Sequence, residues 1–246
     1  MVVLQDVEIS AVEGGTERLR GVLGVPDGEG PWPSVVVVHE AFGVTREMRE
    51  QVEHLAGLGY LALMPDLFSS GGMARCIGGT LRALQSGRGR AWADVESSRA
   101  MLLDRSDSNG AVGIIGFCMG GGFALLAAAQ RDGDENLYQA AAVNYGLLPK
   151  DLDVIEHSCP VVASYGDKDK AVKDGAPTLE AAYTRFGVPH DVKEYPGVAH
   201  AFMNTRMTGP KLLHPLMRVG GIGPDPVAAA DAWGRIDGFF KEYLRA

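Results

Sequence analysis

Short apolar runs alternate with longer stretches of helical periodicity along the chain. Apolar runs bounded by Gly, Pro, Asn or Asp predict buried strands, because a strand covered on both faces is continuously apolar. We expect such strands at 35–38, 60–64, 112–115, 140–145, 161–165 and 192–195. Between them, apolar residues recur every three or four positions, which predicts helices at 47–58, 91–104, 119–130, 176–186 and 227–244.

The N-terminal segments have a different pattern. Residues 2–8 and 17–25 alternate apolar and polar positions, which is typical of an antiparallel pair at a sheet edge with one face in water. The strand and helix alternation that follows predicts a parallel sheet with helices on both faces. The expected fold is therefore α/β, with a mostly parallel sheet of about eight strands and an antiparallel N-terminal hairpin.

The domain organisation is simple. No internal repeat or low-complexity linker divides the chain, so we expect residues 1–246 to form a single domain. The exception to the regular pattern is 69–90, where Gly and Ser interrupt the periodicity and four arginines cluster. We expect this segment to be an excursion over the carboxyl edge of the sheet, above the active site.

Composition and charge exclude several classes of partner. The formal charge is −8, with no basic stripe for phosphates, so we expect no nucleic acid partner. No segment has the eighteen or so uninterrupted apolar residues of a membrane span, and the N-terminus does not resemble a signal peptide, so we expect a soluble, cytoplasmic protein without a membrane partner. The three cysteines match no zinc or redox spacing, which predicts free thiols and no metal.

The stretch GIIGFCMGGGF, residues 113–123, places Cys118 in a G-x-C-x-G sequence between a strand and a helix. This is the pattern of a nucleophile elbow with sulfur in place of oxygen. A helix N-terminus favours the thiolate form, so we expect Cys118 to be reactive. The alternative is a buried structural cysteine, which is our interpretation of Cys76 and Cys159. The glycine spacing matches neither a P-loop nor a dinucleotide-binding fingerprint.

A nucleophile at an elbow needs a histidine base and an acid that orients it, in the chain order nucleophile, acid, histidine. His200 is the histidine that follows a late strand in a Gly-containing loop, PGVAHAF. The acid is expected after the strand 161–165, in the turn GDKD. We choose Asp169, three residues after the glycine, and keep Asp167 as the alternative.

Four stretches together resemble the dienelactone hydrolase family of α/β-hydrolases: VVVVHEAFGVTREMREQVEHLAGLGYLALMPDLF, VGIIGFCMGGGFALLAAA, ASYGDKD and PGVAHAFMN. The resemblance runs from about residue 17 to the C-terminus. It implies the α/β-hydrolase fold and a carboxymethylenebutenolidase-like hydrolysis of a small ester or lactone. It also implies Cys118, His200 and Asp169 as the triad, a thioester intermediate and no cofactor.

The resemblance extends to the surroundings of the thiol. In similar proteins a glutamate at the position of Glu40 hydrogen-bonds the resting thiol, and its charge would oppose ionisation of the sulfur until substrate displaces it. The backbone N–H groups of Met119 and Ala41 are the expected oxyanion donors.

The substrate is less well defined. Family members that take anionic lactones carry an arginine shortly after the histidine, whereas this chain has Asn204 there and Arg206 two residues further on. Other candidate substrate contacts are Phe42 and, in the 69–90 segment, Arg75 and Arg82. The alternatives are a general carboxylesterase or thioesterase acting on neutral esters, and a catalytically idle, ligand-sensing scaffold. We expect a monomer or a small homo-oligomer.

Overall fold

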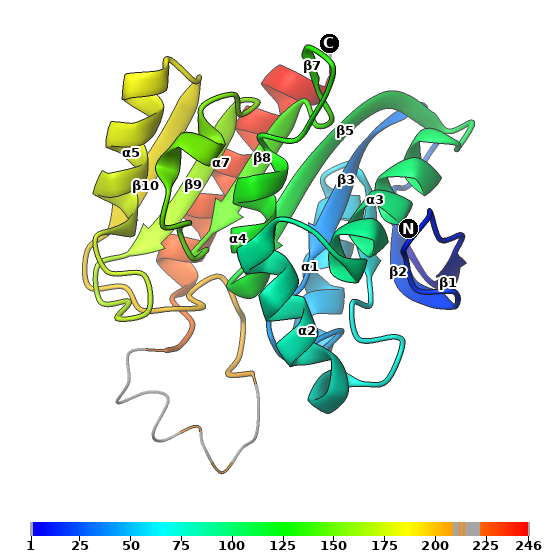
Figure 1. Cartoon of the computed structure of the whole chain (residues 1–246), viewed down its shortest axis with the longest axis horizontal. Coiled ribbons are helices and arrows are strands. Elements are labelled where there is room, and N and C mark those ends of the chain that lie inside the picture. Colours follow the sequence, from blue (N-terminus) through cyan, green and yellow to red (C-terminus); the bar gives the residue numbers. More distant parts are fainter. Residues whose placement is uncertain (1, 209–211, 213, 215–221, 246) are drawn as a thin grey trace.

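The computed structural model describes residues 2–208, 212, 214 and 222–245, and these form an eight-stranded sheet with flanking helices (Figure 1). The strand order is β1-β2-β4-β3-β5-β8-β9-β10. The bounds are β1 Val3–Ile9, β2 Leu19–Val25, β3 Trp32–Val38, β4 Leu61–Pro65, β5 Ser108–Phe117, β8 Ala140–Asn144, β9 Val161–Gly166 and β10 His190–Tyr195. From β4 to β10 neighbouring strands pair in parallel, whereas β1 with β2 and β2 with β4 pair antiparallel. The expected fold class is confirmed.

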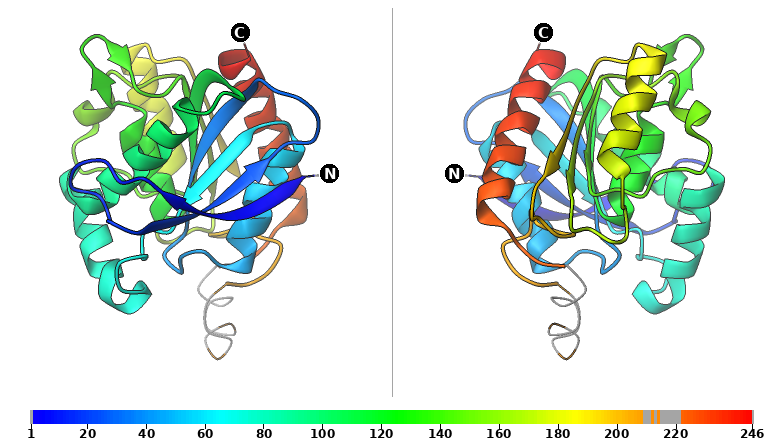
Figure 2. Two further views of the ribbon diagram at one scale, coloured as in Figure 1. Left: turned by 90° about the vertical axis from the view of Figure 1, so that its right-hand side faces the viewer. Right: turned by 90° about the vertical axis from the view of Figure 1, so that its left-hand side faces the viewer.

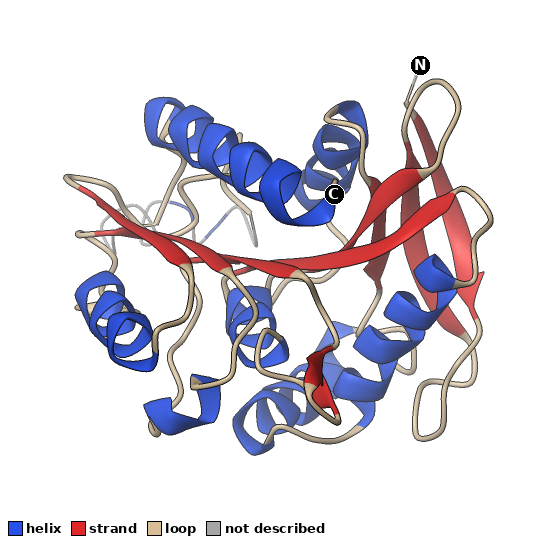
Figure 3. Ribbon diagram, turned by 90° about the horizontal axis from the view of Figure 1, so that it is seen from above, coloured by secondary structure: helices blue, strands red, loops and turns tan. Residues whose placement is uncertain are grey.

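Six helices of the described chain lie on the two faces of the sheet (Figure 3). They are α1 Arg46–Gly57, α2 Met73–Ser86, α3 Arg90–Leu103, α4 Met119–Ala127, α5 Gly175–Phe186 and α7 Pro226–Leu244. Successive side chains of a strand point to opposite faces. In β3, Val35 and Val37 pack in the core beneath α1 and α7, while Val36 and Val38 pack beneath α2 to α5. The four-valine run is thus fully buried because both faces of the central sheet are covered.

The elements outside these layers are short. They are a two-stranded ribbon, β6 Arg131–Asp132 with β7 Glu135–Asn136, and a 3-10 turn, η1 Leu152–Ile155. The sequence pattern predicted neither. Figure 2 shows the twist of the main sheet, with the N-terminal hairpin in blue crossing the direction of the central strands. Within the described residues no helix is long and apolar enough to cross a membrane.

The segment 69–90 differs from the sequence-based expectation, because most of it forms the helix α2. Cys76, Thr80, Ala83 and Leu84 are buried at helical spacing and pack α2 against its neighbours. Glycines bound the helix: Gly72 precedes it with φ 78° and Gly87 ends it with φ 68°, a left-handed conformation that suits glycine. Most of the glycines and serines that suggested an irregular excursion therefore lie at or beyond the ends of a packed helix.

The first turn of α4 lies unusually close to the sheet. A Cβ atom at Gly120 would lie 2.0 Å from the carbonyl oxygen of Val38 in β3. A Cβ atom at Gly116, at the end of β5, would lie 1.9 Å from the carbonyl oxygen of Gly120. Both contacts are with main-chain atoms, which cannot rotate away as a side chain can. The glycines are required because the helix and two strands meet backbone to backbone.

Replacing Gly120 with Ala should therefore lower the free energy of unfolding by about 3 kcal/mol or more, because overpacking against rigid backbone is costly. Urea-induced unfolding, followed by circular dichroism, would measure the change. Gly234 is a matched control, since it lies within α7 and a Cβ atom there would meet nothing within 4 Å. Gly234→Ala should raise stability by about 0.5–1 kcal/mol through helix propensity. Equal stability of the two variants would contradict the close approach.

Candidate active site

Cys118 is the single residue between the end of β5 and the first residue of α4. Its φ of 55° and ψ of −116° lie in a region that non-glycine residues rarely adopt. The backbone N–H of Cys118 donates to the carbonyl of Asn144 at the end of β8, 3.1 Å away. The turn is thus held by the neighbouring strand, and the half-buried thiol is presented at the carboxyl edge of the sheet.

Asp169 and His200 meet at the same edge of the sheet from two different loops. Asp169 follows β9 and is 2% exposed, and its Oδ2 lies 2.5 Å from Nδ1 of His200. Its other oxygen accepts a hydrogen bond of 2.9 Å from the backbone N–H of Ala171. Asp167, the alternative acid, is exposed and accepts instead from the N–H of Gly197. The geometry therefore distinguishes the two acids in favour of Asp169.

The His200 ring is held on several sides. It lies edge-on to the ring of Tyr145, with centroids 5.0 Å apart, and its backbone carbonyl accepts from the N–H of Gly223 at 2.9 Å. Burial lowers the pKa of His200, but the hydrogen bond to Asp169 and the interaction with Cys118 outweigh burial and raise the pKa to about 10. A positively charged imidazole beside the thiol can supply a proton to a leaving group.

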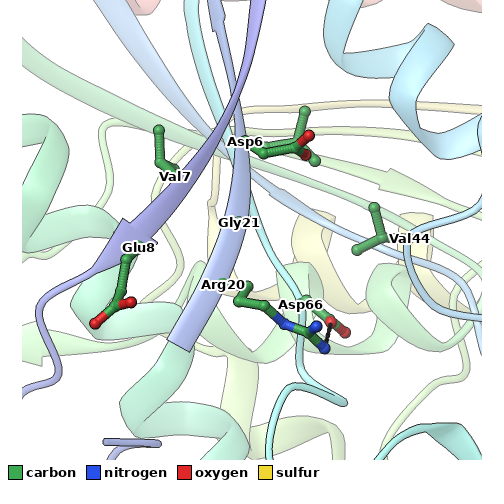
Figure 4. A pocket seen from close by; sticks show the side chains of 8 residues that line it. Asp6, Val7, Glu8, Arg20, Gly21, Val44 and Asp66 are labelled. Atoms are coloured by element: carbon green, nitrogen blue, oxygen red, sulfur yellow. Dashed lines mark hydrogen bonds and ion pairs between the residues drawn. The ribbon is translucent and has the colours of Figure 1, made fainter. Parts of the chain in front are cut away.

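Cys118, Asp169 and His200 line one pocket of about 500 Å³. The other described lining residues are Glu40, Ala41, Phe42, Lys170, Ala171, Ala201, Thr208 and Ile222. A second pocket, of about 430 Å³, lies along the N-terminal hairpin and contains Asp6, Glu8 and the ion pair of Arg20 with Asp66 (Figure 4). Neither cysteine nor histidine lines this second pocket, so the first is the candidate active site.

Glu40 lies in the first pocket but does not hydrogen-bond the thiol as the resemblance implied. The carboxylate is 2% exposed and accepts from Asn204 Nδ2 at 2.7 Å and from Thr208 Oγ1 at 3.1 Å. Burial raises the pKa of Glu40 above its usual range, and these hydrogen bonds oppose the rise. Among the described residues, Asn204 and Thr208 are thus the side chains that hydrogen-bond Glu40. Asn204 was expected to contact the substrate, and in the structure it binds Glu40.

One predicted oxyanion donor, Met119, directly follows Cys118, and the other, Ala41, lines the pocket. Met119 is the first residue of α4, where backbone N–H groups have no partner inside the helix. Ala41 lines the pocket two residues beyond His39, in the loop that follows β3. In the described chain, neither N–H donates to another loop or turn. Both are therefore available to a carbonyl oxygen bound next to Cys118.

The predicted substrate cations do not reach the pocket. Arg75 and Arg82 are exposed on α2 and do not line it. Arg206 pairs with Glu50 on α1, with Nη1 to Oε1 at 2.9 Å. Lys170, which we did not predict, is exposed at the pocket and belongs to no ion pair among the described residues. Lys170 directly follows the predicted acid Asp169, and this position in the sequence could have indicated that Lys170 lies near the site. Phe42 lines the pocket as expected.

A family model and curated relatives indicate the same protein family, and a solved structure indicates the same fold. The model of the dienelactone hydrolase family matches residues 19–244. The carboxymethylenebutenolidase of Pseudomonas putida is 30% identical over 224 residues, covering 83% of this chain and 88% of that protein. A putative carboxymethylenebutenolidase of Saccharolobus solfataricus is 25% identical, covering 91% and 94%. A crystal structure of a putative dienelactone hydrolase from Klebsiella pneumoniae has a TM-score of 0.79 at 23% identity, covering 99% of this chain and 100% of that one.

The charge on His200 predicts how stability changes with pH. The folded pKa of about 10 lies above the unfolded value of about 6.5, so the stabilisation is complete below pH 6.5 and is lost as pH rises towards 10. The free energy of unfolding should therefore fall between about pH 6.5 and pH 10. In His200→Gln the fall should be smaller. Urea-induced unfolding at both ends of this pH range would measure the fall in the free energy of unfolding. An equal fall in the wild-type protein and in His200→Gln would contradict the prediction.

Proposed function

The chain belongs to the dienelactone hydrolase family, and we propose that it is a cysteine hydrolase that cleaves a small ester or lactone through Cys118, His200 and Asp169. The observation that carries the proposal is that a strained elbow cysteine and a histidine paired with a buried aspartate line one pocket. Nucleophile, base and orienting acid are the three roles that acyl transfer requires.

The reaction follows from the roles of these groups. The Cys118 thiolate attacks the ester or lactone carbonyl, and the N–H groups of Met119 and Ala41 stabilise the negative oxygen that forms. When the tetrahedral intermediate collapses, the C–O bond breaks and His200 gives its proton to the leaving alkoxide. His200 then takes a proton from water, which attacks the thioester, and the acid is released as the thiolate is restored. Asp169 keeps the ring oriented throughout.

A specific feature of the pocket favours neutral esters as a second candidate for the substrate class. The described walls are mainly apolar, being formed by Ala41, Phe42, Ala171, Ala201 and Ile222. The predicted arginines Arg75, Arg82 and Arg206 do not line the pocket, and among the described lining residues Lys170 is the one lysine or arginine. Apolar walls bind uncharged acyl and alcohol groups by burial. A carboxylesterase activity is therefore the alternative to hydrolysis of an anionic lactone.

Cys118→Ala should lower turnover of an activated aryl ester by at least about 10³-fold, as removal of a catalytic nucleophile does. In the wild-type protein, rapid quenching should trap an acylated Cys118 peptide, detected by its mass. Cys159 is a matched control, because burial raises the pKa of its thiol to about 12. Cys159→Ala should keep the wild-type rate. Turnover by Cys118→Ala would refute the cysteine mechanism, and alkylation of the wild-type thiol without any turnover would indicate an idle scaffold.

A substrate panel separates the two substrate classes. We expect a higher kcat/KM for a neutral ester than for an acidic lactone with an equally good leaving group, because Lys170 is the only lysine or arginine among the described residues that line the pocket. Lys170→Gln should lower kcat/KM for the acidic lactone roughly two- to fivefold, the size of an exposed ion pair, and leave the neutral ester unchanged. Arg82→Gln, on exposed α2, is the control. A tenfold preference for the acidic lactone would contradict this expectation.

A further inference from the structure

The loop 39–45 between β3 and α1 contains the pocket residues Glu40, Ala41 and Phe42, and we call it the pocket loop. Its first residue, His39, is fully buried. Its Nε2 lies 3.1 Å from the backbone N of Leu67, and its Nδ1 lies 2.7 Å from the carbonyl oxygen of Glu40. An amide N–H can only donate, so Nε2 must accept. The ring proton is therefore on Nδ1, which donates to Glu40. Only the neutral ring in this tautomer satisfies both contacts, and burial lowers the His39 pKa in agreement with the neutral form.

The carbonyl that His39 binds belongs to the same peptide unit as the N–H of Ala41. A trans peptide is planar, and its C=O and N–H point in opposite directions. The Glu40 carbonyl also accepts from the N–H of Gly43 at 3.1 Å, so two donors fix its direction. Fixing the carbonyl of Glu40 in this way fixes the direction of the Ala41 N–H.

The Nε2 side of the His39 ring contacts the loop that follows β4. Leu67 and Phe68 follow β4, the strand next to β3, and the Phe68 ring lies edge-on to His39 with centroids 5.0 Å apart. Phe68 also packs against the same loop, because a Cβ atom at Gly43 would lie 3.0 Å from its ring. The imidazole thus joins the pocket loop to the loop after β4.

We propose that His39 is a positioning residue that aims the Ala41 N–H at the developing oxyanion. The proposal rests on the function proposed above, in which Ala41 is one of two oxyanion donors. His39 itself does not line the pocket. Its effect on the reaction passes through the peptide unit between Glu40 and Ala41, and it should be specific to steps that form a negative oxygen.

Two reactions of the same thiol distinguish this role from a general structural one. Acylation by an activated ester forms an oxyanion, whereas alkylation by iodoacetamide forms an S–C bond and releases iodide without one. In His39→Ala, kcat for the ester should fall about 10- to 100-fold, with KM within about threefold, since loss of one oxyanion donor costs about 10²–10³. The rate of Cys118 alkylation should stay within about twofold of wild type.

Two further variants test the individual hydrogen bonds. An asparagine amide nitrogen is as many bonds from Cα as Nδ1, so His39→Asn can still donate to the Glu40 carbonyl. A glutamine oxygen reaches as far as Nε2, so His39→Gln can accept from Leu67 but leaves Glu40 without this donor. We expect His39→Asn to recover most of kcat and His39→Gln to recover little. This comparison decides the question even if His39→Ala does not fold.

Controls separate this proposal from the function on which it rests. His54→Asn alters a histidine that packs on Trp233, away from the pocket, and should leave both reactions unchanged. Thermal unfolding of each variant would report its stability. If the wild-type protein shows no Cys118-dependent turnover, the proposed function fails. If it does turn over, and His39→Ala keeps its kcat, loses alkylation equally, or is rescued as well by Gln as by Asn, the role of His39 is wrong.

Discussion

Main-chain contact at the start of α4 is the constraint on which the arrangement of the site depends. Gly116 and Gly120 leave no room for a Cβ atom between β5, β3 and the helix. Because the helix begins so close to the sheet, the chain must turn within one residue, and Cys118 takes up the positive φ that this turn requires. The position of the Cys118 Cβ atom, from which the sulfur projects, is therefore set by a strained backbone that the surrounding packing holds in place.

The loops around this fixed point are held by polar groups that are themselves buried. Beyond His200, the backbone N–H and hydroxyl of Thr205 both donate to Glu47 on α1. Gln51, one turn further along α1, donates to the carbonyl of Met203 at 3.0 Å. A buried polar group is costly unless it is hydrogen-bonded, so these contacts specify one conformation of the loop that carries the histidine. The same helix packs its apolar side on the sheet, so the core and the site are stabilised together.

Most of the fold could be predicted from the sequence, because apolar runs such as 35–38 report burial on both faces of a sheet directly. The α2 helix could not, since glycines at 78 and 79 hide a buried face formed by Cys76, Thr80 and Leu84. The pairing of Asp169 with His200 was predictable from chain order. The partners of Glu40 were not, because Asn204 and Thr208 lie more than 160 positions away in the chain and only the folded structure brings them near.

The order of the strands in the sheet has a consequence for how reactivity arises during synthesis. Cys118 follows β5, in the middle of the sheet, whereas Asp169 and His200 follow β9 and β10, the last two strands in the chain, which lie at one edge of the sheet. A nascent chain emerges from its N-terminus, so the cysteine leaves the ribosome well before its partners. Until β10 docks, the sulfur has no imidazole beside it. The proposed acyl transfer therefore requires these last two strands of the sheet to be in place, because they carry the groups that would activate Cys118.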